Sequence, residues 1–498
     1  MKLLTQQFIL SCCILCILPQ AISQNINDAI RYSSLIPGST ARAIGTSSIG
    51  AMGGDFGVLA INPAGLGDYR SSELVFSFSF NTGSTESQLL SSANTQNTSH
   101  TTQPNIENIG LVLHKSPTNG KLVTSNFAVG LQQYNTFNEN FAFSGQTEGS
   151  IVERFLELSE GLTIDQLDNF EAGLAYDAGA IFDFDEDGIY ESDFIDSDIV
   201  NKSQTVDRSG KINELTIAWG GKFRNNLNVG VSVGIPFVSF EEEKAYFEND
   251  PTDVIPFFER LSFIERLSTS GTGVNIKAGI GYTIKRVLRL GLSYQSPSFI
   301  KFDDNFDTQF EYSFTDTGTV ETFSSGSPDG RFDYRLRTPS RITASIGGLL
   351  NLGDIKGFIN LDGQFINYAN NSFNLTAFSD NQDDLDFQEA LNEQISDDLR
   401  SAVNINLGAE LVYKKLRLRS GIGVIGNPSN TSTINESNTL LSAGIGYRAN
   451  RIFIDASYQR RQLEEEYVPY LVLDSSRLQN VSNTATISKF TVTIGYKI

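Results

Sequence analysis

The stretch that decides the fold is residues 38–66, which read GSTARAIGTSSIGAMGGDFGVLAINPAGL. It is crowded with Gly, Ala and Ser, and it ends in the turn-forming run Asn62-Pro63-Ala64-Gly65-Leu66. Gly and Ala bury little apolar surface, and glycine loses much backbone freedom when it becomes ordered. Such a segment cannot build a core of its own, so the rest of the chain has to supply a housing for it.

The residues after Ser72 predict that housing, because apolar and polar side chains alternate in run after run. The clearest run is the last, residues 488–498, where Phe490 and Tyr496 share an apolar face and Thr491 and Lys497 share a polar one. Alternation with a period of two indicates a β-strand with two different faces. Runs of about the 9 to 11 residues that a tilted membrane strand needs also begin at Leu74, Leu215, Leu227, Leu441 and Ile452.

Short turns join several of these runs, and long polar loops separate others. The turns are predicted at residues 224–226, 285–286, 352–354, 414–415 and 449–451. Short turns on one side and long loops on the other are typical of outer-membrane barrels, whose short turns face the periplasm. We therefore predict an all-β fold, a transmembrane antiparallel β-barrel of about 14 strands, within a range of roughly 14 to 16.

Long extracellular loops are predicted between the strands, at residues 81–105, 145–210, 238–270, 303–335, 367–400 and 426–438. Residues 306–314 and 331–338 can be read either as strands or as parts of loops. Three of the loops contain apolar residues at helical spacing, which predicts short amphipathic helices at residues 151–162, 254–267 and 385–399. Such helices would cap the barrel mouth or pack only on neighbouring loops.

Residues 1–23 are predicted to be a secretory signal peptide. Lys2 precedes an apolar run at residues 8–18, and Ala21-Ile22-Ser23 forms a cleavage site before Gln24. The apolar run is too short to span a bilayer as a helix. The mature chain is expected to begin near Gln24 and to be exported.

The composition excludes several classes of site. All three cysteines, Cys12, Cys13 and Cys16, lie in the predicted signal peptide, which excludes disulfides and thiolate metal sites from the mature chain. The formal charge of −21 argues against nucleic-acid binding. Histidine occurs only at His100 and His114, with no oriented partner nearby in sequence, so an enzyme is not expected.

An acidic segment at residues 183–188, DFDEDG, has the DxDxDG start of a calcium loop. In such loops alternate carboxylates converge on the ion and the glycine permits a sharp turn. Position twelve, where a bidentate acid should lie, is Phe194, and Asp193 or Asp196 would have to replace it. Structural calcium is thus a possible cofactor, with a plain acidic loop as the alternative and no other cofactor expected. The predicted ligands are Asp183, Asp185, Asp187 and Asp193.

Gly421-x-Gly423-x-x-Gly426 matches the dinucleotide-binding pattern in letters only. It lies in a predicted strand that ends at Asn427-Pro428 with no helix after it, so the geometry that holds a phosphate is missing. Glycines facing a crowded lumen explain this motif better, because glycine in a strand marks a close approach or a bend.

Three motifs that follow one another in the opening stretch carry a resemblance to a known family. They are STARA at residues 39–43, GAMGG at residues 50–54 and INPAGL at residues 61–66, and RTPSR at residues 337–341 is a further match. Together they resemble the amino-terminal hatch and a later strand of the long-chain fatty acid transporter family of outer membrane proteins. With the barrel pattern, the resemblance covers essentially the whole mature chain.

The resemblance implies a monomeric barrel in the bacterial outer membrane, plugged by a hatch. Residues 24–72 would form the hatch and residues 73–498 the barrel. It also implies passive uptake of hydrophobic molecules without ATP, with the ligand leaving sideways through a wall opening beside a kinked strand. The partners implied are a hydrophobic small-molecule ligand, outer membrane lipid and the barrel-assembly machinery that inserts such proteins.

The resemblance assigns hatch and gating roles to a set of residues in the opening stretch. Pro63 fixes one backbone angle and Asn62 can hydrogen-bond to local backbone, so these two would hold the turn of the plug. For a ligand carboxylate the sequence suggests only Arg335, Arg337 and Arg341, and it identifies no ligand site. The hatch residues are Arg42, Gly53, Gly54, Asn62, Pro63, Ala64, Gly65 and Leu66.

Two classes of function follow from these observations. The first is an outer membrane channel for passive uptake of hydrophobic small molecules, long-chain fatty acids or similar lipophilic compounds, gated by the hatch. The alternative is a non-transporting barrel of the same fold that acts as a scaffold in protein secretion or surface assembly. A receptor energised from the inner membrane would need a much larger plug than the segment between Gln24 and Glu73.

Overall fold

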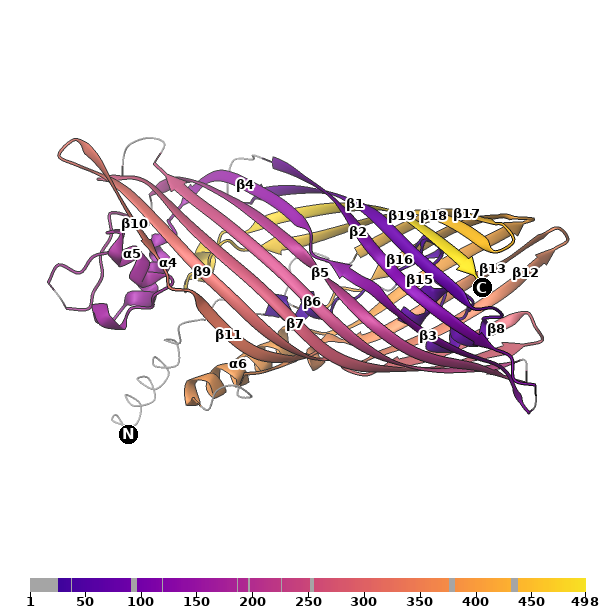
Figure 1. Ribbon diagram of the computed structural model, residues 1–498. Helices are drawn as coiled ribbons and strands as arrows, with labels where there is room; N and C mark the ends of the chain where they lie inside the picture. The colour runs from indigo at the N-terminus through magenta and orange to yellow at the C-terminus, as the bar shows by residue number, and fades with distance from the viewer. Residues whose placement is uncertain are drawn as a thin grey trace.

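The fold is a long barrel with a folded segment inside it, seen in a computed structural model (Figure 1). The structure describes residues 26–36, 38–90, 96–118, 120–185, 187–195, 198–224, 226–250, 255–375, 381–430 and 438–498. The predicted signal peptide and Asp196 lie outside these residues. Among the described residues, no helix is both long and apolar enough to cross a membrane.

Fourteen antiparallel strands close the barrel, as predicted. The last strand pairs with the first along its whole length, from Glu73 opposite Lys497 to Leu89 opposite Val481. The five predicted short turns all lie between consecutive strands of this ring. In order, the strands are β1 (Glu73–Leu89), β2 (Gln96–Lys115), β3 (Leu122–Thr136), β5 (Ile199–Phe223), β6 (Leu227–Asn249), β7 (Phe258–Ile284), β8 (Leu288–Gln295), β12 (Arg341–Leu352), β13 (Ile355–Asn367), β15 (Ser401–Tyr413), β16 (Leu416–Ile425), β17 (Asn438–Arg448), β18 (Ile452–Tyr467) and β19 (Val481–Lys497).

The outward face of the ring is apolar near the short turns. On β6, Leu227, Val231 and Phe237 are exposed, and further along the strand their places are taken by Ser239 and Glu241. An exposed apolar belt of this kind requires lipid around it. Exposed tyrosines lie close to the short turns, as in the aromatic girdle at a membrane interface. These are Tyr282, Tyr413, Tyr447 and Tyr496.

Additional strands extend the wall beyond the apolar belt at the long-loop end. They are β4 (Glu139–Glu148), β9 (Phe299–Asp316), β10 (Thr319–Gly326), β11 (Gly330–Arg337) and β14 (Ser372–Asn374). β7 pairs with β8 near the turns and with β9 further along. The loops predicted at 81–105, 238–270 and 303–335 are therefore mostly wrong, since most of each region is strand, as are residues 306–314 and 331–337.

The helix predicted at residues 254–267 is also wrong, because β7 begins at Phe258. Apolar residues there fit a helical stripe, but Leu261 and Phe263 also alternate with polar neighbours and are buried. Both edges of this segment find a partner, β6 on one side and β9 on the other. Two complete hydrogen-bonded ladders outweigh the helical tendency of a short segment.

The other two predicted loop helices are present. α4 (Val152–Ser159) lies within the first, and with η3 (Ile164–Gln166) and α5 (Ala172–Asp177) it forms a lid at the long-loop end (Figure 1). Phe155 of α4 packs edge-on against Phe263 and Phe310 in the lid's own apolar cluster. The last predicted helix is α6 (Gln382–Asp398), which lies close to η4 (Tyr368–Asn370); η5 (Ser475–Arg477) belongs to the loop before β19.

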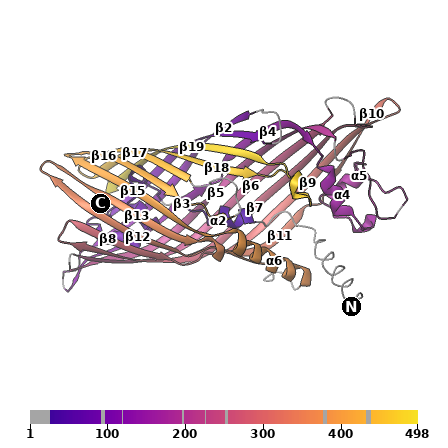
Figure 2. The ribbon, with the colours of Figure 1, turned by 180° about the vertical axis from the view of Figure 1, so that it is seen from behind.

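The segment before β1 runs through the barrel lumen, where α2 is visible behind the strands in Figure 2. Three short helices of this segment begin at a residue whose side chain accepts a hydrogen bond from a backbone N–H. Thr40 accepts from Ala43, Asp55 from Gly57 and Asn62 from Ala64, which is how polar N-caps start short helices. The elements are α2 (Ile26–Ser33), α3 (Ala41–Thr46), η1 (Phe56–Ala60) and η2 (Pro63–Asp68).

Candidate functional site

Glycines on the inner face of the barrel form a seat for the hatch, residues 26–72. A Cβ atom at Gly230 would collide with the backbone of Pro63, and one at Gly408 or Gly421 would collide with the Thr46 carbonyl. In the glycine motif at 421–426, Gly421 therefore marks close approach of the hatch, whereas Gly423 and Gly426 are packed on wall residues, and close packing explains the motif as predicted. Side chains are equally excluded where other hatch atoms touch Gly110, Gly130, Gly220 and Gly279.

The predicted residues Asn62 to Leu66 form one tight turn on this seat. The Asn62 side-chain nitrogen donates to the carbonyls of Gly50 and Ile280, each at 3.3 Å. The Leu66 carbonyl accepts a hydrogen bond of 2.6 Å from the Asn126 amide on β3. Gly65 is packed closely on Val58 of the hatch. A Cβ atom added at Gly65 would lie 2.7 Å from a methyl carbon of Val58. This turn is thus held by both the hatch and the wall.

Arg42 joins the hatch to the opposite part of the wall. Its guanidinium forms two hydrogen bonds with the Glu410 carboxylate, of 3.1 and 3.3 Å, and it donates to the carbonyls of Gly53 and Gly54 at 3.4 Å. Glu410 also pairs with Arg419 at 2.6 Å. A bidentate arginine–carboxylate pair is strong and directional. The structure therefore brings Arg42, Gly53 and Gly54 together, and the Gly54 N–H donates to the Gly65 carbonyl of the Asn62 turn at 3.3 Å.

Asp68, at the end of the hatch, forms a second ionic anchor that the sequence analysis missed. Its carboxylate lies 2.8 Å from both Lys222 and Arg289 on the wall. Burial works against ionisation, but the two cations outweigh it and lower the pKa of Asp68 below its usual value. Its only sequence signal is an acid two residues after the Asn62–Leu66 motif. The two basic partners are more than a hundred residues away in the chain, so their pairing needs the closed barrel.

A side opening interrupts the barrel wall between β2 and the β3–β4 segment. Residues 108–115 of β2 pair with residues 125–132 of β3, and β3 then has a bulge at Tyr134. Within the described residues, positions 96–106 of β2 pair with β1 on one edge and with no strand on the other. The two walls approach again where the Asn97 amide donates to Ser144 at 3.4 Å. The opening therefore has two closed ends and lies beside a kinked strand.

The hatch is hydrogen-bonded to this kink. The Ile36 N–H donates to the Tyr134 carbonyl at 3.0 Å, and the Asn135 amide donates to the Ser34 carbonyl at 2.9 Å. Arg341, one of the three arginines suggested for a carboxylate, instead donates to the Ser33 carbonyl from a buried position. The other two suggested arginines, at positions 335 and 337, are exposed on β11. Residues 33–36 therefore contact the kinked strand directly.

Two cavities meet at the side opening. The lumen cavity above the hatch has a volume of about 650 Å³ and is lined by α2, the kink and β18. A second cavity of about 660 Å³ is bordered by Thr101 and Gln103 of β2 and by Asn140 of β4, and the rest of its lining comes mainly from β5, β6, β7 and β9. Both cavities are lined by Thr101, Glu139 and Arg208. The two cavities are therefore adjacent and share part of their walls.

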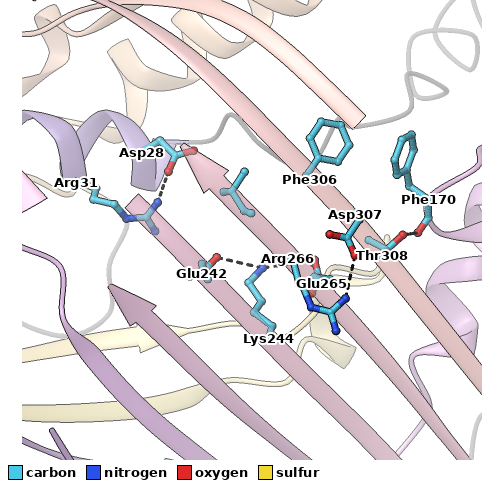
Figure 3. Close-up of a pocket in the computed structure, with 11 residues that line it drawn as sticks. Asp28, Arg31, Phe170, Glu242, Lys244, Glu265, Arg266, Phe306, Asp307 and Thr308 are labelled. Atoms are coloured by element: carbon cyan, nitrogen blue, oxygen red, sulfur yellow. Dashed lines mark hydrogen bonds and ion pairs between the residues drawn. The ribbon is translucent and has the colours of Figure 1, made fainter. Parts of the chain in front are cut away.

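A layer of paired charges separates α2 from the lid (Figure 3). Arg31 pairs with Asp28 on α2, and Lys244 lies 3.7 Å from Glu242 and 3.5 Å from Glu265. Above this layer Phe170 of the lid packs on Phe306, and Arg266 pairs with Asp307 at 3.0 Å. The cavity among these groups holds only about 60 Å³. An apolar molecule moving along the barrel axis would have to displace these ion pairs.

Three of the four predicted calcium ligands are grouped in the lid loop. Carboxylate oxygens of Asp183, Asp185 and Asp187 all lie within 4.8 Å of one another. The Asp183 carboxylate also accepts the N–H of Gly188 at 2.9 Å, which closes the turn. Asp193 is outside this group and accepts the hydroxyl of a wall tyrosine, Tyr312, at 2.8 Å. Burial raises the pKa of Asp193 although that hydrogen bond opposes the shift.

Fold and site together define a transmembrane barrel that is plugged from within and open at one side. Solved structures with this fold are a Pseudomonas aeruginosa FadL homologue, at 12% identity and TM-score 0.53, and the P. putida toluene transporter TodX, at 12% identity and TM-score 0.52. The Ralstonia pickettii toluene transporter TbuX matches at 13% identity and TM-score 0.50. Each alignment covers 93% of this chain and 99% of the other.

These neighbours agree with the family resemblance carried by the hatch motifs, so that expectation is confirmed at the level of the fold. No protein-family model matches the chain, and no curated protein sequence matches it. The likeness therefore lies in the barrel and its plug rather than in overall sequence.

Replacing Gly230 by valine should loosen the hatch, because the new side chain occupies the place of the Pro63 backbone. We expect a several-fold rise in ion conductance per barrel in planar bilayers. Gly348→Val is the matched control, since a Cβ atom at Gly348 meets no other atom within 4 Å. Equal conductance of the two variants would contradict the glycine seat.

The hatch should be sensitive to acid through Asp68. Because its folded-state pKa is lowered, its contribution to hatch binding is complete above the ordinary aspartate pKa and is lost as the pH falls through the folded-state value. Wild-type conductance should stay low from neutral pH to the ordinary aspartate pKa and rise only below it. Asp68→Asn should raise conductance already at neutral pH. Asp354→Asn, in an exposed turn, should behave like the wild type.

Proposed function

We propose that this chain is an outer membrane channel for the passive uptake of hydrophobic small molecules, long-chain fatty acids or similar lipophilic compounds. The observation that carries the proposal is a lumen cavity above a seated hatch, next to a second cavity that borders the edge of β2 where the pairing with β3 has stopped. Structural neighbours named as a FadL homologue and as toluene transporters support it. A monomer inserted by the barrel-assembly machinery belongs to the same proposal.

The geometry favours movement through the side of the barrel over movement along its axis. The hatch blocks one end of the lumen, and the lid with its layer of paired charges blocks the other. Moving buried ion pairs into an apolar surrounding is costly. The side opening needs no such displacement, and it begins near Ile106, where the outward-facing residues of β2 change from apolar to polar. An apolar ligand that passes there meets the boundary of the lipid.

The hatch acts as the gate in this proposal. It contacts the lumen cavity through Ile26 and Ile30, and it is hydrogen-bonded to the kinked strand through Ile36. A ligand that enters the cavity therefore touches both the hatch and the strand that borders the opening. The ionic anchors at Arg42 and Asp68 hold the rest of the hatch while residues 26–36 respond.

Bridging the side opening should stop uptake. A Thr101→Cys/Asn140→Cys pair faces the opening from both sides, and the sequence has no other cysteine after Cys16. Reaction with a short, reducible bifunctional thiol reagent should lower uptake of labelled dodecanoate or toluene several-fold in a deletion strain carrying the variant. Reduction of the bridge should restore it.

The matched control is Asn97→Cys/Ser144→Cys, where the two walls already touch and a bridge leaves the opening free. Unchanged uptake after bridging at 101 and 140 would contradict the side route. A deletion strain with no uptake defect, together with stoichiometric co-purification of partner proteins, would instead support the scaffold function.

We propose in addition that the lid loop binds one structural calcium ion through Asp183, Asp185 and Asp187. The three carboxylates offer the oxygen ligands that calcium prefers, and their oxygens are close enough to share one ion. Asp193 fits this set poorly because it is engaged by Tyr312. Bound calcium would offset the mutual repulsion of the three carboxylates and stiffen the loop.

Calcium should slow proteolysis of the lid loop several-fold relative to the same protein in chelator. Asp185→Asn should abolish the difference, because it removes one of the three ligands. Glu160→Gln, an exposed acid elsewhere in the lid, is the control and should keep it. Identical cleavage of the wild type with calcium and with chelator would show that the loop is only acidic.

A further inference from the structure

The short turns of the barrel, which face the periplasm, carry basic side chains almost without acidic ones. Among the six turns that join consecutive strands at this end, Asp354 in the β12–β13 turn is the one acid. This end is therefore locally positive in a chain whose formal charge is −21. The basic residues of the turns, all exposed, are Lys121, Arg224, Lys285, Arg286, Lys414, Lys415 and Arg451.

Three of these turns lie side by side and bring five cations together. The Arg224 N–H donates to the Lys121 carbonyl at 2.9 Å, which joins the β5–β6 turn to the β2–β3 turn. The Thr283 N–H donates to the Asn226 carbonyl at 2.8 Å, which joins the β5–β6 turn to the β7–β8 turn. We name the exposed cations of these turns and of the adjoining end of β2 the basic arc, which consists of Lys115, Lys121, Arg224, Lys285 and Arg286.

The charges of the basic arc are not neutralised by the protein. Within the described residues, none of the five side chains forms an ion pair. The acids at this end of the lumen are engaged or buried, since Asp68 pairs with Lys222 and Arg289, and Glu73 is 4% exposed. Cations without a counter-charge repel one another, and an anion from outside the chain relieves that repulsion.

The backbone of these turns is unfavourable for the residues that occupy it. Arg224, Lys285 and Arg286 have φ angles of 47°, 49° and 61°, in the left-handed region that glycine and asparagine enter more easily. Two-residue hairpin turns of this kind favour Asn-Gly or Asp-Gly. Lys414 in the β15–β16 turn repeats the pattern with a φ of 55°. Strain that is kept at one kind of residue points to a use for its side chain.

The basic arc lies at the level of lipid head groups. Lys115 continues the outward face of β2 from Leu113, which is exposed. Tyr282 of the aromatic girdle accepts a hydrogen bond of 3.2 Å from the Asn226 amide in the β5–β6 turn. Aromatic girdles mark the interface between acyl chains and head groups. The phosphates of neighbouring lipids are therefore within reach of the long Lys and Arg side chains.

We propose that the basic arc binds the phosphate groups of anionic phospholipids in the periplasmic leaflet, with their acyl chains lying on the apolar belt. This inference is independent of the proposed function. Lysine and arginine bind phosphate through charge-assisted hydrogen bonds, and clusters of them at a membrane surface select anionic lipids. The position of the arc beside the apolar belt favours a lipid over an acidic protein as the partner.

The single tryptophan of the chain reports on the lipids at this place. Trp219 on β5 lies opposite Phe127 and Val231, which are exposed on the lipid-facing side of the wall. Its indole N–H donates to the Ser125 hydroxyl at 3.1 Å, and Ser125 lies opposite Lys115. Bromine on an acyl chain quenches tryptophan fluorescence on contact, so the lipid beside Trp219 can be measured directly.

The test uses the purified full chain in phosphatidylcholine bilayers with a minor share of phosphatidylglycerol, and bromine on one lipid or the other. In the wild type, brominated phosphatidylglycerol should quench Trp219 several-fold more than its share of the bilayer predicts. Arg224→Asn/Lys285→Asn/Arg286→Gly should remove most of this preference, because three of the five cations are lost. The new residues suit the left-handed backbone, so the barrel should fold at least as well. Heat-modifiable migration in gels checks the folding.

Lys414→Asn/Lys415→Gly is the matched control. It makes the same kind of change in the β15–β16 turn, on a distant part of the ring, and should keep the preference at Trp219. Because the bromine is carried by the acyl chains, free phosphate gives no signal in this measurement.

Equal quenching of the wild type by the two brominated lipids, or an unchanged preference in the triple variant, would overturn the lipid site. A loss in the control as large as that in the triple variant would show general attraction to a charged rim and would equally overturn it. Binding of an acidic protein through the basic arc, without any lipid preference, would assign the surface to that protein instead.

Discussion

Closure of the backbone hydrogen-bond ring is the constraint on which the other features depend. No water reaches the hydrocarbon core of a membrane, so each strand needs a partner on both edges there. Pairing of β19 with β1 completes that ring. Between β2 and the β3–β4 segment the pairing stops beyond Ile106, where the outward side chains have become polar. Water can satisfy the unpaired edges at that level, so the barrel can open there without exposing peptide groups to lipid.

A closed ring of this size leaves a lumen that its own side chains do not fill. The chain fills it with a segment that has little core of its own, and glycines on the facing strands let the two backbones approach. Gly230 against Pro63 and Gly408 against Thr46 are the clearest contacts. Close packing alone does not fix one position of the hatch on the wall. The ion pairs at Arg42 and Asp68 fix that position because they are directional. The part of the hatch near the cavity is instead hydrogen-bonded to the bulged end of β3.

The sequence predicted the fold class well because period-two alternation is a local signal, and the hatch because its motifs are contiguous. It predicted Arg42, Gly53 and Gly54 as hatch residues, and in the structure both glycine carbonyls accept from the Arg42 guanidinium, which also pairs with Glu410. It failed at residues 254–267, where a helical stripe and a strand pattern coexist and only the neighbours on both edges decide.

By itself, the sequence determined that apolar and polar faces alternate for hundreds of residues and that a small-residue segment precedes them. Those facts suffice for a plugged barrel, because each follows from residues close together in the chain. Only the tertiary structure decided where the wall opens, which charges hold the hatch, and which basic turns lie side by side. Such properties depend on strand register and on pairs like Asp68 with Arg289, which are set by closure of the ring. A one-residue change of register would turn every one of these side chains to the other face.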